Sequence, residues 1–317
     1  MKWIERLLGL KEPVRHSPRP TTEQPLAVKT SLSAETIPPA DWSDIGGWNR
    51  YLQAKGSDGP FNVPTLIGAQ GWQSVRFLSF VKERGGRVWF PGCGIDPGPR
   101  FYAYVGCAVL ATDFSPVAVR VQQKFAALAP ETMFADWSSF VDSNALFEKS
   151  GRFEVAGHDF TTGTPTGVFD VVINCHAFQG LSPTAMNAAG RHFYAALRPG
   201  GAAIMDTINV QGKARDVLED SLIDAGFFIP FSASERWYRA QLERTGIIYE
   251  MVLGHPLIPY CEQCPAKHFH KDADRDRNIL ESFRAEYEAR LAAEEPSVRV
   301  VLDSPETIVA HVVYATG

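Results

Sequence analysis

Glycines and an acidic residue stand at a spacing that suits a nucleoside site. The run from Val88 to Gly94 reads VWFPGCG, a strand-like stretch that breaks into glycines. Glycine lets a backbone approach a ligand closely, because no Cβ stands in the way. Asp113 follows Gly94 by 19 residues, at the end of the next apolar run. An acid about 20 residues after such a loop can accept hydrogen bonds from ribose hydroxyls, so we expect a nucleoside here with Phe114 against the base.

Polar residues also end the next two expected strands. Asp159, followed by Phe160, ends the third strand, where a carboxylate can accept a hydrogen bond from an exocyclic amine. Asn174 and His176 end the fourth strand, close to where chemistry would occur. We expect Phe160 and Asn174 in the cofactor site. We expect His176 to act as a general base if the acceptor is a hydroxyl or a protonated amine, because histidine titrates near neutral pH. The alternative is a histidine that caps the strand or lines the pocket.

A second group of potential ligands lies farther along the chain. Cys261 and Cys264 form a C-x-x-C pair, and His268 and His270 follow them within ten positions. These side chains can bind zinc tetrahedrally, although ordinary zinc fingers place a longer spacer between the two pairs. Two interpretations stay open, a zinc site and a plain surface loop.

The elements that must position these residues alternate between strands and helices. Residues 41–84 read as helical, and strands and helices follow one another from residue 86 to about residue 227. This alternation predicts an α/β fold, with a doubly wound and mostly parallel sheet. Such a sheet binds ligands beyond the carboxyl ends of its strands.

Composition and motifs disfavour several other classes of protein. The 317 residues are 45% hydrophobic and carry a formal net charge of −5 with dispersed lysines and arginines, so we expect no nucleic-acid partner. No window is apolar enough to span a bilayer, and no leader is recognised, so we expect a cytoplasmic protein. A dinucleotide loop needs a third glycine where this chain has Pro97, and no Gly-Lys-Ser/Thr phosphate loop is present.

The ordered motifs PGCG, ATDFS, GHDF, FDVVINCHAF, LRPGG and AGF resemble those of the class I, Rossmann-like S-adenosylmethionine-dependent methyltransferases. The resemblance covers residues 85–227 and the final strand at 306–317. It implies a seven-stranded sheet whose antiparallel edge is completed by that final strand. The motifs VWFPGCG and GHDF, with the insertion at 130–151, look like the thiopurine S-methyltransferase-like branch.

The resemblance also implies roles for individual residues. Phe90 or Pro91 stands where an acid is common in the family, and Asp96 stands where many members have a third glycine. The thiopurine branch tends to place an acidic and a basic residue where this chain has Asn174 and Cys175. The implied cofactor contacts are Pro91, Gly92 and Gly94 at the methionine part, Asp113 at the ribose, Phe114 at the adenine face and Asp159 at the adenine amine.

We therefore predict a methyltransferase that transfers a methyl group to a small-molecule acceptor. The alternative is a non-catalytic cofactor-binding or assembly protein with the same fold, and a nicotinamide oxidoreductase is a third interpretation. Acceptor and oligomeric state stay open. The expected organisation is an amphipathic helix and flexible linker at 1–40 and a methyltransferase domain at 41–317, divided into a helical cover at 41–84, a cofactor-binding core at 85–254, a helical insertion at 255–304 and a final strand at 305–317.

Overall fold

A computed structural model describes most of the chain from residue 84 to residue 231 and several shorter segments outside it. The expected amino-terminal helix and linker at 1–40 lie outside the described residues. No helix in the described part is long and apolar enough to cross a membrane. The described segments are 45–54, 77, 81, 84–134, 151–175, 177–208, 214–231, 234, 236–237, 249–252, 255–259, 285–286, 288–290, 292–294, 304 and 306–315.

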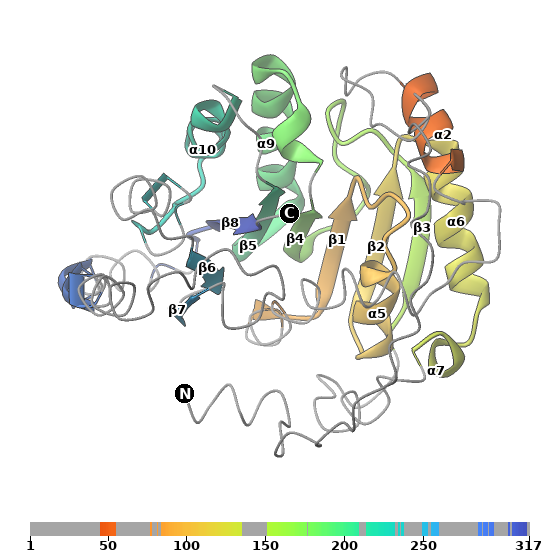
Figure 1. Ribbon diagram of the computed structural model, residues 1–317, viewed down its shortest axis with the longest axis horizontal. Helices are drawn as coiled ribbons and strands as arrows, with labels where there is room; N and C mark the ends of the chain where they lie inside the picture. Colours follow the sequence, from red (N-terminus) through yellow and green to blue (C-terminus); the bar gives the residue numbers. More distant parts are fainter. Residues whose placement is uncertain are drawn as a thin grey trace, which may run out of the picture.

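A parallel β-sheet forms the centre of the molecule (Figure 1). Within the described segments it has six strands in the order β3-β2-β1-β4-β5-β8, and each neighbouring pair is parallel. The α/β fold with a parallel sheet is therefore confirmed. The strands are β1 (Arg87–Pro91), β2 (Ala108–Asp113), β3 (Phe153–Gly157), β4 (Phe169–Cys175), β5 (Leu197–Ile208) and β8 (Val309–Ala315).

Two expectations about the far edge of the sheet differ from the structure. The final strand β8 runs parallel to β5, with a register from Ala202 opposite Val309 to Ile208 opposite Ala315, so the predicted antiparallel edge is wrong. Residues between α10 and β8 form a separate antiparallel hairpin of β6 (Tyr249–Val252) and β7 (His255–Pro259). Only two residues separate these strands, and so short a connection can join only an antiparallel pair. The described sheet thus has six strands, not the seven expected.

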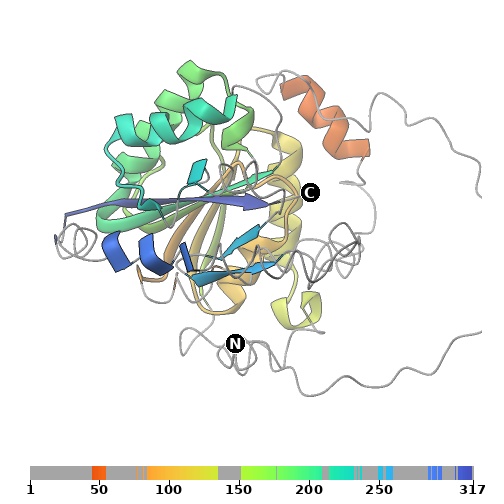
Figure 2. The ribbon, with the colours of Figure 1, turned by 60° about the vertical axis from the view of Figure 1, so that its left-hand side comes forward.

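Helices cover both faces of the sheet (Figure 2). Side chains alternate along β1, so that Val88 and Phe90 pack toward α5 and α6 while Trp89 packs toward α9 and α10. The two faces therefore have separate apolar cores, as a doubly wound sheet requires. The helices are α2 (Ile45–Ala54), α5 (Gly98–Tyr104), α6 (Pro116–Ala127), α7 (Pro130–Met133), α9 (Pro183–Ala196) and α10 (Ala214–Ala225), with a 3₁₀ turn η3 (Phe178–Gly180).

Local signals set the ends of several helices. The Oγ of Ser115 accepts a hydrogen bond from the backbone N–H of Ala118 at 3.4 Å, and Pro116 occupies the first turn of α6. Gly226 follows α10 with φ of 108°, a conformation that suits a glycine at the end of a helix. The first signal fixes where α6 begins, and the second fixes where α10 ends.

Candidate cofactor site

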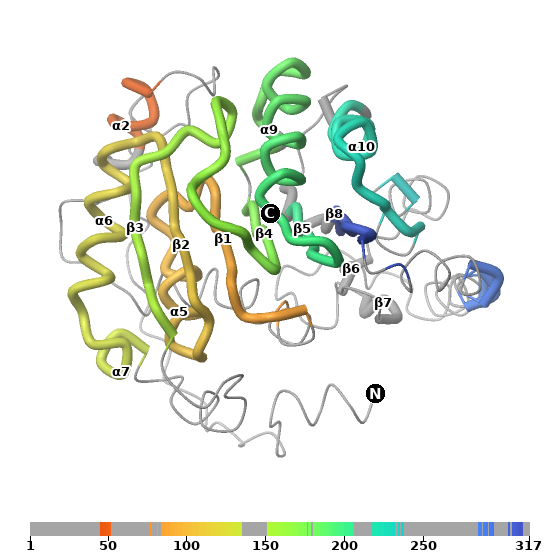
Figure 3. The backbone as a smooth tube through the Cα atoms, turned by 180° about the vertical axis from the view of Figure 1, so that it is seen from behind, coloured from red at the N-terminus to blue at the C-terminus, as the bar shows by residue number. Residues whose placement is uncertain are grey.

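The carboxyl ends of the strands meet at one edge of the sheet, where the order of connection reverses. From β1 the chain proceeds outward to β2 and β3, whereas β4 pairs with the opposite side of β1 (Figure 3). Ligands of open α/β sheets bind in the crevice at such a reversal. The loop after β1 and the residues that end β2, β3 and β4 therefore form the candidate site.

The glycine loop after β1 turns through two positive φ angles, 64° at Gly92 and 53° at Gly94. A Cβ added to Gly92 would lie 2.7 Å from the Cβ of Ala177 and 3.0 Å from Cε1 of Phe160. A Cβ added to Gly94 would meet no atom of the described residues within 4 Å. Gly92 thus makes room for the protein itself, while Gly94 borders open space. That either lines a cofactor stays a prediction.

Asp113, at the end of β2, joins the glycine loop to the start of α6. Its Oδ2 accepts the backbone N–H of Gly94 at 2.8 Å, and its Oδ1 accepts that of Ser115 at 2.8 Å. Only 6% of the residue is exposed, and burial raises the pKa of its carboxyl to about 6, although the backbone N–H bonds counteract the shift. Each carboxylate oxygen has a second lone pair, so the group can still accept from a ligand.

Asp159 supplies a second carboxylate next to the first. Its Oδ1 accepts the backbone N–H of Thr161 at 2.8 Å and the hydroxyl of the same residue at 2.7 Å. Its Oδ2 accepts no hydrogen bond from the described residues. The negative charge of Asp159 also raises the pKa of Asp113, so the two carboxylates lie close enough to interact electrostatically. The structure brings together the two acids that the sequence singled out.

Asn174 and Phe160 lie at the same edge, but protein contacts engage them. Asn174 donates from Nδ2 to the carbonyl of Pro91 at 3.0 Å, and its Oδ1 accepts the N–H of Phe178 at 2.8 Å. Phe160 is 7% exposed and packs against Phe193, with ring centroids 5.4 Å apart. Asn174 thus links β1 to the turn after β4 through two hydrogen bonds. The Phe160 ring lies beside Gly92 of the glycine loop. Contacts from either to a cofactor stay predictions.

Gln122 is a site residue that the sequence reasoning missed. It lies on α6, and its Nε2 donates to the carbonyl oxygens of Gly94 at 3.0 Å and Asp96 at 2.7 Å. Its neighbours on the buried face of that helix, including Val121 and Phe125, are apolar. A polar residue inside an apolar helical stripe was the available signal, because a buried amide needs partners.

The side chain of Asp96, which stands where the resembling motif has a third glycine, makes a hydrogen bond within the loop. Its Oδ1 accepts the backbone N–H of Gly98 at 2.8 Å, in the first turn of α5. The backbone N–H groups at a helix N-terminus attract anions. In this protein a side-chain carboxylate already occupies that position.

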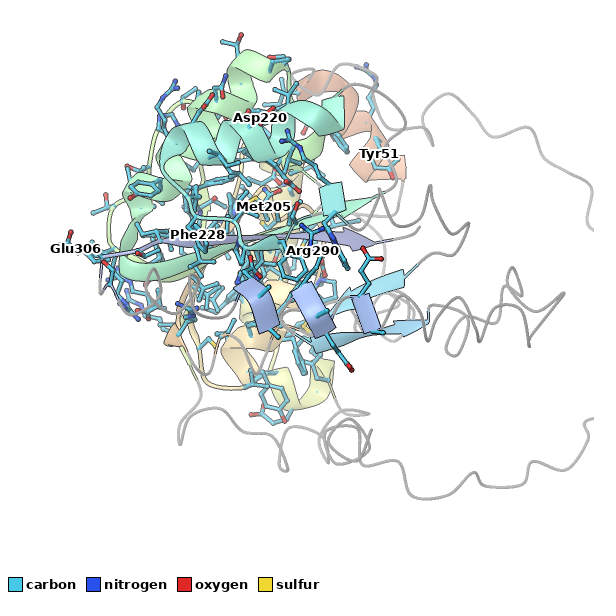
Figure 4. All side chains as sticks on the ribbon, turned by 90° about the vertical axis from the view of Figure 1, so that its left-hand side faces the viewer. Tyr51, Met205, Asp220, Phe228, Arg290 and Glu306 are labelled. Carbon is cyan, nitrogen blue, oxygen red and sulfur yellow. The ribbon has the colours of Figure 1, made fainter. Side chains whose placement is uncertain are left out.

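Helix α2 covers the start of α6 at the carboxyl edge of the sheet (Figure 1, upper right). The Oδ1 of Asn49 accepts the hydroxyl of Ser115 at 2.5 Å. Tyr51, labelled in Figure 4, packs with Ile95 of the glycine loop against the apolar start of α6. The Trp48 ring meets the Tyr51 ring edge-on, with centroids 5.5 Å apart. These contacts place α2 against α6 and the glycine loop, and the expected helical cover at 41–84 stays a prediction.

Contacts also tie the carboxyl-terminal insertion to the core. The guanidinium of Arg290 lies over the rings of Phe231 and Trp237, 5.1 and 5.8 Å from their centroids (Figure 4). Glu294 accepts the backbone N–H of Phe231 at 2.6 Å. The insertion is therefore anchored to the segment that follows α10.

Two predicted sites cannot be followed in the structure. The proposed base His176 lies outside the described residues, between Cys175 and the 3₁₀ turn. The proposed zinc ligands lie outside them as well: Cys261, Cys264, His268 and His270. The part of the chain that is described contains no group of three or more histidine, cysteine, aspartate or glutamate residues arranged to hold a metal ion.

No family model and no curated protein matches this chain. Among solved structures, it resembles one from work on the conversion of a disulfide bond into a thioacetal group during echinomycin biosynthesis, at 24% identity over 40% of this chain and 45% of that one, with a TM-score of 0.28. Magnesium protoporphyrin IX methyltransferase from Synechocystis PCC 6803 with bound SAM is 17% identical over 63% of this chain and 89% of its own, with a TM-score of 0.37. The glycopeptide N-methyltransferase MtfA is 16% identical over 41% of this chain and 49% of its own, with a TM-score of 0.32. The match thus spans less than half of the first and third of these proteins.

Proposed function

We propose that this protein is an S-adenosylmethionine-dependent methyltransferase that acts on a small-molecule acceptor. The observation that carries the proposal is the carboxylate of Asp113 bonded to the N–H of Gly94 at the carboxyl edge of a parallel sheet, with Asp159 near enough for its charge to raise the pKa of Asp113. Carboxylates accept hydrogen bonds from ribose hydroxyls and an adenine amine, and they attract a cationic sulfonium. Bare backbone at Gly94 leaves room for the ligand.

The same charges make a dinucleotide a poorer occupant. A pyrophosphate binds at the N-terminus of the helix that follows the glycine loop. Here the carboxylate of Asp96 already accepts the N–H of Gly98 at that helix start. A pyrophosphate would also meet the negative charges of Asp113 and Asp159. This arrangement favours a cationic nucleoside over a nicotinamide dinucleotide.

The residues present fit S-adenosylmethionine. Asp113 would hold the ribose diol, Phe114 would lie on the adenine, Asp159 would accept from the adenine amine, and the loop of Pro91, Gly92 and Gly94 would hold the methionine part. When bound, S-adenosylmethionine supplies a methyl group on a positively charged sulfur, and most of the acceleration of its transfer can come from orientation in a closed site. In this proposal α2 and the carboxyl-terminal insertion exclude water and hold the acceptor.

The proposal also includes a general base and a branch of the methyltransferase family. His176 removes a proton from the acceptor when that group is a hydroxyl or a protonated amine. The motif similarity supports membership of the thiopurine S-methyltransferase-like branch. Zinc at Cys261, Cys264, His268 and His270 is a separate proposal, which metal analysis of the purified protein tests.

Isothermal titration with S-adenosylmethionine and S-adenosylhomocysteine tests the proposal, followed by a product assay on panels of small-molecule acceptors. We expect both cofactor forms to bind and one acceptor class to be methylated. NADH serves as the control ligand and should not bind. Absence of binding by both cofactor forms refutes the proposal. Tight binding without turnover on any acceptor favours the non-catalytic cofactor-binding protein instead.

A further inference from the structure

The buried side-chain amide of Gln122 joins α6 to the glycine loop through two hydrogen bonds. Gln122 is fully buried, on the apolar face of α6. Its Nε2 reaches the carbonyl oxygens of Gly94 and Asp96, at 3.0 and 2.7 Å. The N–H of Gly94 donates to Asp113 on the other side. The backbone of Gly94 is therefore held at its N–H from β2 and at its C=O from α6.

The orientation of the amide is determined by its partners. Both partners are carbonyl oxygens, which accept and cannot donate, so the NH₂ group must face them. The Oε1 of Gln122 then points away from the loop, and it is buried with no hydrogen-bond partner within the described part of the chain. A buried polar atom without a partner destabilises a fold. An apolar side chain of similar size would avoid that cost but would leave the carbonyl oxygens of Gly94 and Asp96 without this donor, so the contribution of the glutamine lies in its hydrogen bonds to the loop.

The loop that Gln122 holds is the one that borders open space. A Cβ on Gly94 meets no atom within 4 Å, whereas the backbone of Gly94 touches the carboxylate of Asp113. A shift of this loop would move the Gly94 N–H off Asp113 and change how that carboxylate faces a ligand. Fixing a binding loop in advance reduces the entropy lost on binding.

We propose that Gln122 is a positioning residue that holds residues 94–96 in their ligand-binding conformation before a ligand arrives. The inference rests on the proposed function, since the ligand concerned is the cofactor of that site. Gln122 itself does not touch the ligand; it acts through the carbonyls of Gly94 and Asp96.

The test compares Gln122→Met with its matched control Gln123→Met, because residue 123 is exposed on the same helix. Methionine keeps the length of the side chain and removes both the NH₂ group and the Oε1, which has no partner among the described residues. We expect Gln122→Met to weaken S-adenosylhomocysteine binding about tenfold or more, as the loss of two hydrogen bonds predicts. Its Tm without ligand should stay within about 4 °C of the parent. The control should match the parent in both measurements.

Amide hydrogen exchange at Gly94 gives a second measurement that needs no ligand. We expect roughly tenfold faster exchange in Gln122→Met, with unchanged exchange in the central strands. Unchanged affinity with unchanged exchange overturns the proposal, and so does a Tm that falls in step with affinity or a variant that does not fold. If the parent itself fails to bind S-adenosylhomocysteine, the proposed function is refuted, and the exchange at Gly94 still decides whether Gln122 holds the loop.

Discussion

Lowering the pH should weaken cofactor binding through protonation of Asp113. Burial raises the pKa of this carboxyl from 3.8 to about 6 in the free protein. Ribose hydroxyls donate best to the ionised form, so binding should return the pKa toward its usual value. The Kd should then rise about tenfold between roughly pH 8 and pH 5.

The stability of the free protein should change in the opposite direction. A pKa raised in the folded state gives a stabilising contribution that is present below the unfolded pKa of 3.8 and is lost as pH rises through about 6. The full contribution is on the order of 3 kcal/mol for a residue this well buried. From acid toward neutral pH, the contribution of Asp113 to stability therefore falls while cofactor affinity rises.

Titration calorimetry with S-adenosylhomocysteine across this pH range measures the change in Kd, and urea unfolding of the free protein measures the change in stability. The control is Asp113→Asn, which keeps the shape of the side chain and cannot ionise, so both trends should flatten. Asp159 faces the same space, and an Asp159→Asn variant should keep both trends. A parent Kd that is constant with pH, or a trend that survives in Asp113→Asn, refutes the reasoning.

Four variants test the surrounding site. Both positions have a positive φ, so alanine is strained at either one. Gly94→Ala should weaken S-adenosylhomocysteine binding in calorimetry more than it lowers Tm, since its Cβ meets no atom of the described residues within 4 Å. Gly92→Ala should lower Tm several degrees further than Gly94→Ala does, because its Cβ would also lie 2.7 Å from the Cβ of Ala177, and equal melting of the two variants would contradict this. Asn174→Ala should destabilise the fold by about 1–3 kcal/mol in urea unfolding, since a buried carbonyl and N–H lose their partner, whereas an unchanged midpoint would show that water replaces the amide. Replacing Cys261 and Cys264 by Ser should leave cofactor affinity intact, because such insertions lie outside the nucleotide crevice; loss of affinity in calorimetry would mean that the insertion contacts the cofactor.

Those parts of the fold that depend on neighbouring residues were predictable from the sequence. The cap at Ser115 with Pro116, and the stop at Gly226, are local signals with direct stereochemical causes. The position of Asp113 at the end of β2 follows from one apolar run and one acid. The direction of β8 was not predictable in this way. A short apolar strand pairs equally well in either direction, and its direction depends on the path of the chain before it.

The site shows a different limit of sequence reasoning. Gly92 and Gly94 look equivalent in the sequence, and both have positive φ in the structure. Only tertiary packing distinguishes them, since Phe160 and Ala177 fill the space beside Gly92, whereas no described residue fills the space beside Gly94. The bond from Gln122 to Gly94 links residues 28 positions apart. No local pattern reports such a bond, because its partners are backbone carbonyls, which every residue has. A polar side chain on the buried face of a helix indicates that a partner exists, and only the fold identifies that partner as the glycine loop after β1.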